Sequence, residues 1–188
     1  MKRFAGVALF VAAFSLGLDV SAQVQDGKAT APAPRAAARP ADVASVYGVM
    51  AALYDVVSGP AGKVRDWDRL RSLFTADGKM GAVGAKPNGE FALRAMTVDD
   101  YIARATKPFS EMGFFESELA RTSDTFGQIT HVFSTYEARK APGDAKPFVR
   151  GVNSLQLYND GSRWWIVSLL WRAEDDKLSL PEKYLKSH

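Results

Sequence analysis

Residues 148–171 read FVRGVNSLQLYNDGSRWWIVSLLW and predict one long β-hairpin. Two runs rich in Val, Leu, Ile, Tyr and Trp flank NDGS at 159–162, and Asp-Gly supplies the positive φ angles of a tight type I′ turn. With this Asp-Gly pair as the two loop residues, Leu155 is expected to face Ile166. Both faces of the hairpin then carry apolar side chains. We therefore expect helices on one face, and a ligand, more sheet or a second subunit on the other.

The first 22 residues have the segment order of a secretory signal peptide. A basic start (MKR, 1–3) precedes an apolar run at 4–18, and VSA at 20–22 resembles a signal-peptidase site. We therefore expect cleavage near Ala22 and a periplasmic or secreted bacterial protein. An uncleaved N-terminal membrane anchor is the alternative, although Asp19 interrupts the apolar run and the run is short for a membrane span.

Charge and cysteine content exclude several classes of protein. The 188 residues carry a net charge of +3, and removal of residues 1–22 takes two basic residues and one acidic residue, which leaves +2. A nucleic-acid-binding protein would be much more basic. Because the chain has no Cys, it has no disulfide framework, thiolate nucleophile or thiol-ligated metal site. An exported protein without disulfides favours a bacterial periplasm.

The chain divides into four segments by composition. The signal peptide at 1–22 is followed by residues 23–41, which are rich in Ala and Pro and predict a disordered tether. One ordered domain is expected over 42–173, because this length supports a single hydrophobic core. Residues 174–188 then form a C-terminal tail.

Three helices are expected at the start of the domain. Asp42 is expected to cap the first helix, which ends before SGPAG at 58–62. Asp66 is expected to cap a shorter helix that runs through Phe74. A capping box over 97–100, with Asp in place of the usual Glu, opens the third helix, which Pro108 is expected to disrupt. The buried stripe of the first helix is Val43, Val46, Tyr47, Met50, Leu53, Tyr54 and Val57.

Strands are expected near 79–83, then over 114–124 and 128–139, and finally in the hairpin. Helices followed by a run of long strands predict an α+β fold. In this fold, three N-terminal helices pack in a strongly curved antiparallel sheet.

This order of helices and strands resembles the nuclear transport factor 2-like superfamily, which includes ketosteroid isomerases and SnoaL-like polyketide cyclases. DWDRLRSLFTADG at 66–78 and WWIV at 164–167 carry the resemblance, which covers about residues 42 to 173. It implies a cystatin-like cone, in which a curved sheet and helices surround a mostly apolar cavity. It also implies a homodimer through the outer face of the sheet.

A ketosteroid isomerase would need a carboxylate base in its first strand and acidic oxyanion-hole donors. The resemblance places Ala82 where that base would stand, and Val49 near the position of the first-helix Tyr. We therefore do not expect isomerase chemistry of that kind.

His131 is the one His of the expected domain, since His188 is terminal. Ile129 and Phe133 share its strand face, so His131 is expected to be desolvated. It is a candidate catalytic base near neutral pH, and a structural histidine is the alternative. No metal site is expected, because one His with scattered carboxylates has no recognisable ligand spacing. No cofactor is expected either.

Aromatic side chains and a few polar ones are candidates to line a cavity for an apolar small molecule. These ligand-binding candidates are Tyr54, Trp67, Phe74, Tyr101, Phe133, Asn153, Trp164 and Ser168. The alternative is that the aromatic residues simply fill the cone. Arg150 is expected opposite Trp171, either to clamp an anionic ligand or as an ordinary cation–π pair. Glu116 and Glu118 share one strand face, which a solvated face explains.

The sequence therefore predicts an exported, SnoaL-like protein that binds a small apolar molecule in a cavity. A cofactor-independent lyase, isomerase or hydrolase is one alternative, and a dimerising protein-interaction module is the other. The expected homodimer rests on an apolar sheet face that carries Val152, Trp165, Val167 and Leu169.

Overall fold

The computed structural model describes residues 36–86 and 88–186. The expected signal peptide at 1–22, and the tether as far as residue 35, lie outside the described residues. Regular structure begins at Pro40, two residues before the expected start of the domain. Within the described ranges, no helix is both long enough and apolar enough to cross a bilayer.

The expected first helix is two helices, α1 (Pro40–Val43) and α2 (Val46–Val57). Ser45 separates them, because its backbone is extended and its side chain caps α2 by accepting a hydrogen bond from the Gly48 amide at 3.0 Å. The expectation that Asp42 caps the helix is therefore wrong. Asp42 is buried and accepts two hydrogen bonds from Arg69, at 2.7 and 2.9 Å. Tyr47 was expected in the buried stripe of this helix, but it is 73% exposed.

The two other expected caps are confirmed. Asp66 caps α3 (Trp67–Leu73) by accepting from the Arg69 amide at 3.0 Å. Thr97 and Asp100 form the capping box of α4 (Val98–Glu111). The expected disruption at Pro108 is wrong, because α4 continues through it. The missing Pro108 amide removes one i→i−4 hydrogen bond, and because Pro108 lies in the last turn, only three more helical residues follow it.

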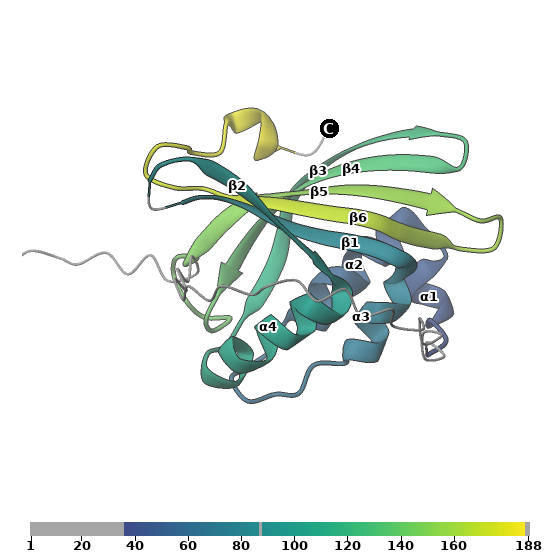
Figure 1. The fold of residues 1–188 in the computed structure, drawn as a ribbon, viewed down its shortest axis with the longest axis horizontal. Coiled ribbons are helices and arrows are strands. Elements are labelled where there is room, and N and C mark those ends of the chain that lie inside the picture. The colour runs from purple at the N-terminus through teal and green to yellow at the C-terminus, as the bar shows by residue number, and fades with distance from the viewer. Residues whose placement is uncertain (1–35, 87, 187–188) are drawn as a thin grey trace, which may run out of the picture.

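Six strands form one sheet in the order β2-β1-β6-β5-β4-β3. All neighbours are antiparallel except β1 and β6, which are parallel. The helices α2, α3 and α4 lie together on one side of the curved sheet (Figure 1), which confirms the α+β fold class. The strands are β1 (Phe74–Ala85), β2 (Phe91–Thr97), β3 (Phe115–Phe126), β4 (Ile129–Arg139), β5 (Val149–Asn159) and β6 (Trp164–Ala173).

The strand β2 was not expected from the sequence. This strand is at the sheet edge, and most of its side chains are exposed, so it lacks the alternation of a half-buried strand. The strand β2 can be recognised only in the folded protein, where it pairs with β1.

The hairpin of β5 and β6 is confirmed, but its expected register is wrong. The Asp160 carboxylate accepts from the amides of Ser162 and Arg163, at 2.8 and 2.9 Å, and these bonds favour a four-residue loop over a two-residue turn. A bulge then adds Val167 between two pairs of the ladder. As a result Leu155 faces Leu169, and not Ile166.

The core lies between the helices and the concave face of the sheet. Burial of these side chains supplies the main driving force for folding. The largest fully buried apolar side chains are Phe74, Met50, Leu70, Leu73, Leu155, Leu157 and Ile166.

The C-terminal tail covers part of the outer, convex face of the sheet. Its short 3-10 helix, η1 (Glu182–Tyr184), lies on the side of the sheet away from the helices (Figure 1). The Thr135 hydroxyl donates to the Tyr184 carbonyl at 2.5 Å, and the Phe133 and Tyr184 rings are in contact. The tail is therefore packed onto the domain.

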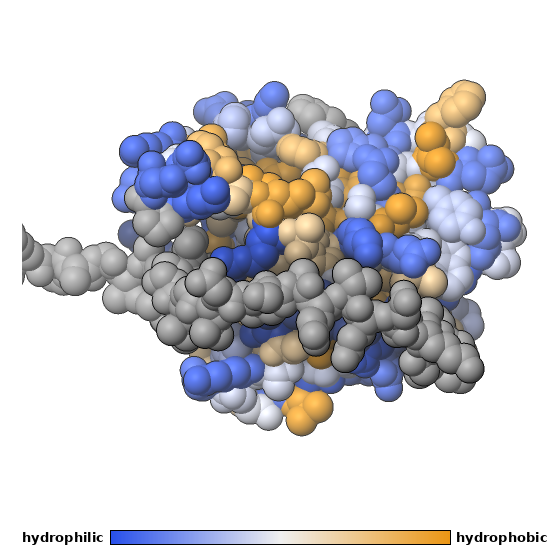
Figure 2. All heavy atoms as spheres, in the orientation of Figure 1, coloured by the Kyte–Doolittle hydropathy of each residue, from blue (hydrophilic) through white to orange (hydrophobic). Residues whose placement is uncertain are grey.

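The apolar outer face differs in composition from the expected one. Leu169 points into the core, because the bulge at Val167 changes the phase of β6. Instead, four apolar side chains that pair directly between neighbouring strands form an apolar row over β3, β4, β5 and β6. This row comprises Phe126, Ile129, Tyr158 and Trp165. Figure 2 shows hydrophobic side chains at the tip of the β3–β4 hairpin, at the upper right, and over β2, β1 and β6.

Candidate functional site

The edge strand β3 brings three charged side chains to the concave face. Glu116 pairs with Ala138, and Glu118 with Tyr136, and both partners are buried on that face. A bulge between Glu118 and Ala120 adds one residue to β3. The bulge changes the phase of the strand, so Arg121 shares a face with Glu118 and makes two hydrogen bonds to it, at 2.5 and 2.8 Å.

Ser58 ties the start of β3 to the end of α2. The Glu116 amide donates to the Ser58 hydroxyl at 3.0 Å, and this hydroxyl donates to the Tyr54 carbonyl at 2.7 Å. Gly59 and Phe114 form an isolated bridge beside it. These bonds hold Glu116 next to the C-terminal end of α2.

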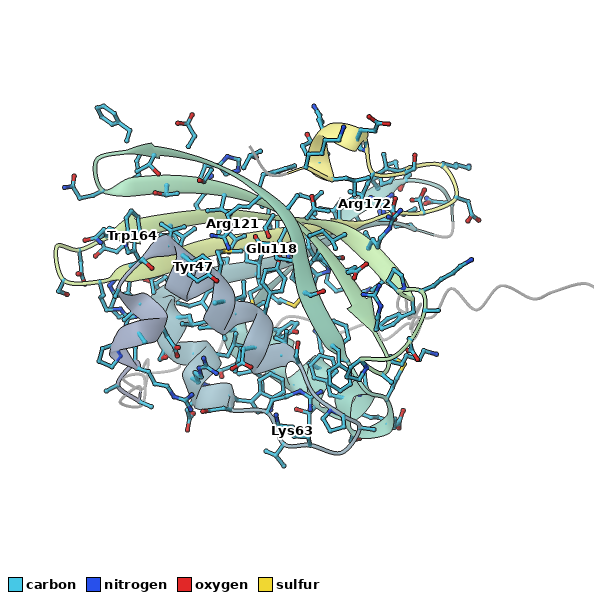
Figure 3. The ribbon with its side chains drawn as sticks, turned by 180° about the vertical axis from the view of Figure 1, so that it is seen from behind. Tyr47, Lys63, Glu118, Arg121, Trp164 and Arg172 are labelled. Carbon is cyan, nitrogen blue, oxygen red and sulfur yellow. The ribbon has the colours of Figure 1, made fainter. Side chains whose placement is uncertain are left out.

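A groove of about 340 Å³ lies between α2 and β3. Figure 3 shows Tyr47 of α2 beside Glu118 and Arg121 of β3, and the Arg121 guanidinium lies 5.7 Å from the centre of the Tyr47 ring. The groove is therefore lined by aromatic rings from the helix and by charged groups from the strand. The principal lining residues are Tyr47, Tyr54, Ser58, Glu116, Glu118 and Arg121.

A hydrogen-bond network runs from the floor of the groove into the cone. The hydroxyls of Tyr54 and Ser134 are 2.6 Å apart, and Ser134 also donates to Glu118. The Asn153 amide donates to the Tyr54 hydroxyl at 3.2 Å and to Glu116 at 3.4 Å. The network therefore links both carboxylates of β3 through one phenol and one amide.

The environment of Glu116 changes its acidity. Burial raises the pKa of Glu116 to about 7, and the hydrogen bond from Asn153 opposes that rise. Glu116 in turn raises the pKa of three buried phenols, Tyr54, Tyr101 and Tyr136, whose own burial is the larger cause. The phenols therefore remain neutral, while Glu116 changes its charge near neutral pH.

Three of the predicted ligand-binding residues gather around Glu116. Tyr54 and Asn153 hydrogen-bond in its network, and Tyr101 lies within its electrostatic reach. Tyr101 also makes edge-on ring contacts with Trp67 and Trp171.

The other predicted interior residues pack in the core. Trp67 stacks on Phe109, Phe74 is fully buried, and Trp164 packs against the core cluster. Arg150 does not face Trp171 as expected. It forms a two-bond ion pair with Glu174, at 2.8 and 3.0 Å.

His131, Phe133 and Ser168 lie on the outer face, away from the groove. His131 Nε2 is 3.2 Å from the Ser154 hydroxyl, and its ring contacts Phe133. His131 and Phe133 are half-buried, whereas Ile129 on the same face is 60% exposed, so the surroundings of His131 are only partly apolar. Ser168 changes face because the hairpin register differs from the expected one, and it pairs with the exposed Gln156.

Glu116 and Glu118 were expected on a solvated strand face, so they were not among the predicted site residues. Apolar residues occupy both phases of this strand, with Phe114 and Ala120 in one and Phe115 and Leu119 in the other. Alternation therefore does not assign the faces of β3. Among the described residues, no group of three or more His, Cys, Asp or Glu is placed to hold a metal ion.

No protein-family model and no curated protein matches the sequence, whereas solved structures do. A Nostoc punctiforme protein of unknown function with a cystatin-like fold aligns with a TM-score of 0.53 at 8% identity, over 70% of this chain and 90% of that one. A Kribbella flavida protein aligns with a TM-score of 0.51 at 12% identity, over the same shares of the two chains. A Silicibacter pomeroyi protein described as NTF-2-like aligns at 0.45 and 19% identity, over 70% of this chain and 94% of that one. The first two likenesses, with TM-scores above 0.5, show a shared fold.

Proposed function

We propose that this chain, which has a cystatin-like fold, is a member of the nuclear transport factor 2-like superfamily and binds a small molecule in the groove between α2 and β3. The proposal rests on one observation. Glu116, at the floor of the groove, is joined by Asn153 to the Tyr54 hydroxyl, inside a cone that is otherwise mostly apolar. An apolar pocket with a few converging polar groups is typical of a ligand site.

Proton transfer at Glu116 is the second candidate function. A general acid or base works best when its pKa lies near the working pH, and Glu116 has a pKa of about 7. This pKa favours a lyase, isomerase or hydrolase that needs no cofactor. Glu116 replaces His131 as the candidate catalytic residue, because His131 is on the other face of the sheet.

We also propose that the protein is exported and that it forms a homodimer. The segment order of residues 1–22 supports cleavage near Ala22 and a periplasmic or secreted location. The apolar row across β3, β4, β5 and β6 supports a homodimer through the outer face, because an exposed apolar patch is stabilised by a partner.

Binding in the groove is tested by titrating ¹⁵N-labelled protein with a library of small fragments. Bound fragments are expected to shift the amide signals of Tyr54, Ser117 and Glu118. The second hollow of the surface, of about 300 Å³ around Arg150 and Glu174, provides an internal comparison. The proposal would be contradicted if fragments shift the amide signals of only the second hollow, or shift the signals of neither the groove nor this hollow.

The polar network is tested by Tyr54→Phe, which removes the hydroxyl but keeps the ring. Fragment affinity is expected to fall about tenfold, as for the loss of one buried hydrogen bond. Tyr158→Phe on the outer face is the matched control and is expected to bind as wild type. Native mass spectrometry of protein from its own host then identifies any small molecule that it retains.

A further inference from the structure

Among the described residues, Glu116 differs from the other buried or half-buried carboxylates in having no arginine partner. In the described ranges, five acidic side chains are buried or half-buried, and four of them form ion pairs with arginines. Glu116 forms none. The four ion pairs are Asp42–Arg69, Glu118–Arg121, Glu137–Arg139 and Glu174–Arg150.

The arginine that lines the groove, and the two arginines near the phenols Tyr101 and Tyr136, are already engaged. Arg121 is held by Glu118 and lies over the Tyr47 ring. Arg65 donates to four backbone carbonyls of the loop between α2 and α3. Arg172 pairs with Asp175. None of these arginines is therefore placed to neutralise Glu116.

The oxygen atoms around Glu116 also have unused hydrogen-bonding capacity. Among the described residues, its side chain has one partner, the Asn153 amide at the long distance of 3.4 Å. Tyr136 is 5% exposed and lies within the electrostatic reach of Glu116. Its hydroxyl and that of Tyr101 have no hydrogen-bond partner in the described part of the chain, and neither is sealed from solvent. Buried polar groups usually find partners, so Glu116, which lines the groove, has hydrogen-bonding capacity that the described side chains do not use.

We infer that the groove binds a ligand with a primary ammonium group on an aromatic or apolar body, and that the ammonium pairs with Glu116. The inference rests on the proposed function of the groove. A buried carboxylate is costly without a positive partner, and the ligand supplies it. An ammonium has three donors and no acceptor, which suits a carboxylate and phenol oxygens. The Tyr47 ring already contacts Arg121, whereas the Tyr54 ring also lines the groove and favours a cation.

Three probes of similar shape test the ligand class, namely phenethylamine, 2-phenylethanol and 3-phenylpropionate. Each is titrated into the ¹⁵N-labelled protein at pH 8. Phenethylamine is expected to shift the groove amides and to bind about tenfold more tightly than the alcohol, as for a charged hydrogen bond in place of a neutral one. The carboxylate is expected to bind most weakly, because Glu116 repels it.

The pH dependence gives a second readout. With a pKa of about 7, Glu116 is mostly ionised at pH 8 and mostly protonated at pH 6. An aliphatic ammonium stays charged over this range, so phenethylamine affinity is expected to fall about tenfold from pH 8 to pH 6. The affinity of the alcohol is expected to stay constant.

Glu116→Gln keeps the size of the side chain and removes its charge. The variant is expected to bind phenethylamine and 2-phenylethanol equally, with no change between pH 6 and pH 8. Glu137→Gln removes a half-buried carboxylate on the same sheet that is paired with Arg139. As the matched control, it is expected to keep the preference for the amine and its pH dependence.

Two results would overturn the inference in different ways. If the alcohol or the carboxylate shifts the groove amides with equal or higher affinity than the amine, the groove binds small molecules but not through an ammonium. If no probe and no library fragment shifts the groove amides, the proposed function fails together with the inference.

Discussion

Glu116 and Glu118 are two residues apart on one strand, yet their surroundings give them different properties. Glu118 has Arg121 and the Ser134 hydroxyl as partners. Glu116 has one long hydrogen bond, and burial raises its pKa to about 7. Desolvation disfavours the charged form, and no positive side chain in the described ranges pairs with Glu116 to compensate. The difference between the two residues is therefore the presence of an arginine.

The raised pKa of Glu116 predicts how stability depends on pH. Between about pH 4.5 and pH 7, the folded protein keeps a proton on Glu116 that the unfolded chain has lost, so the free energy of unfolding falls as pH rises. Glu116→Gln removes this contribution. The variant is expected to gain stability relative to wild type as the pH rises through this window, in urea denaturation at several pH values. A constant difference between the two proteins would show that Glu116 has an ordinary pKa.

Arg65 organises the loop between α2 and α3 without an acidic partner. It is buried and donates to the carbonyls of Val57, Gly59, Pro60 and Lys63, and its guanidinium lies 5.0 Å from the centre of the Phe109 ring. Several backbone carbonyls therefore depend on a single side chain.

Replacement of Arg65 by Met is expected to destabilise the protein strongly. The change keeps most of the apolar stem but leaves buried carbonyls without donors, at a cost of about 3 kcal/mol. Lys63→Met in the same loop is the control, because the Lys63 side chain is exposed, and it is expected to change stability by less than about 0.5 kcal/mol. Thermal unfolding of both variants measures the difference. Equal effects would contradict this role of Arg65.

At the scale of elements, two bulges position the site and the core. The bulge in β3 brings Arg121 to the face of Glu118, and the bulge at Val167 turns Leu169 inward. A strand has a side-chain period of two, so one extra residue moves every later side chain to the other face.

The bulge in β6 predicts that substitutions of Leu169 and Val167 have costs of different size. Leu169→Ala is expected to cost about 3 kcal/mol, because it leaves a cavity in the core. Val167→Ala is expected to cost less than about 1 kcal/mol, because Val167 is 40% exposed at the bulge. Chemical denaturation of the two variants checks this. Equal costs would mean that both residues share one face, as in a hairpin without the bulge.

At the scale of the whole molecule, the two faces of the sheet have different roles. The concave face holds the core and the groove, whereas the C-terminal tail covers only part of the convex face. The apolar row at the other end of the convex face remains exposed, with Phe126 at 86% and Ile129 at 60%. An exposed row of this kind favours association with a second copy of the chain.

A homodimer through this row is expected in solution at micromolar concentration. Tyr158→Glu places a charge in the row and is expected to shift the protein towards monomer in light scattering. Val64→Glu is the matched control, because Val64 is also exposed but lies in the loop before α3. A monomeric wild type, or equal dissociation by both variants, would contradict the prediction.

Local patterns were sufficient to predict two of the three expected helix caps and the main strands. Asp66 caps α3 and Thr97 caps α4 as expected, because a cap bonds to amides only three residues away. The hairpin at 148–171 and the α+β class were predicted for a similar reason, since alternation and helical spacing reflect burial along one element. Tyr54 and Asn153 are buried and Tyr101 packs partly buried against the core, whereas their expected role in ligand binding stays a prediction.

Contacts between distant segments decided the rest. Asp42 bonds to Arg69 instead of capping a helix, β1 lies parallel to β6, and the bulges set the faces of β3 and β6. The pKa of Glu116 depends on β4, β5 and the helices that bury it, and on the positions of arginines elsewhere in the chain. Burial and ion pairing are properties of three-dimensional packing, so the residue on which the proposed site depends could be recognised only in the folded protein.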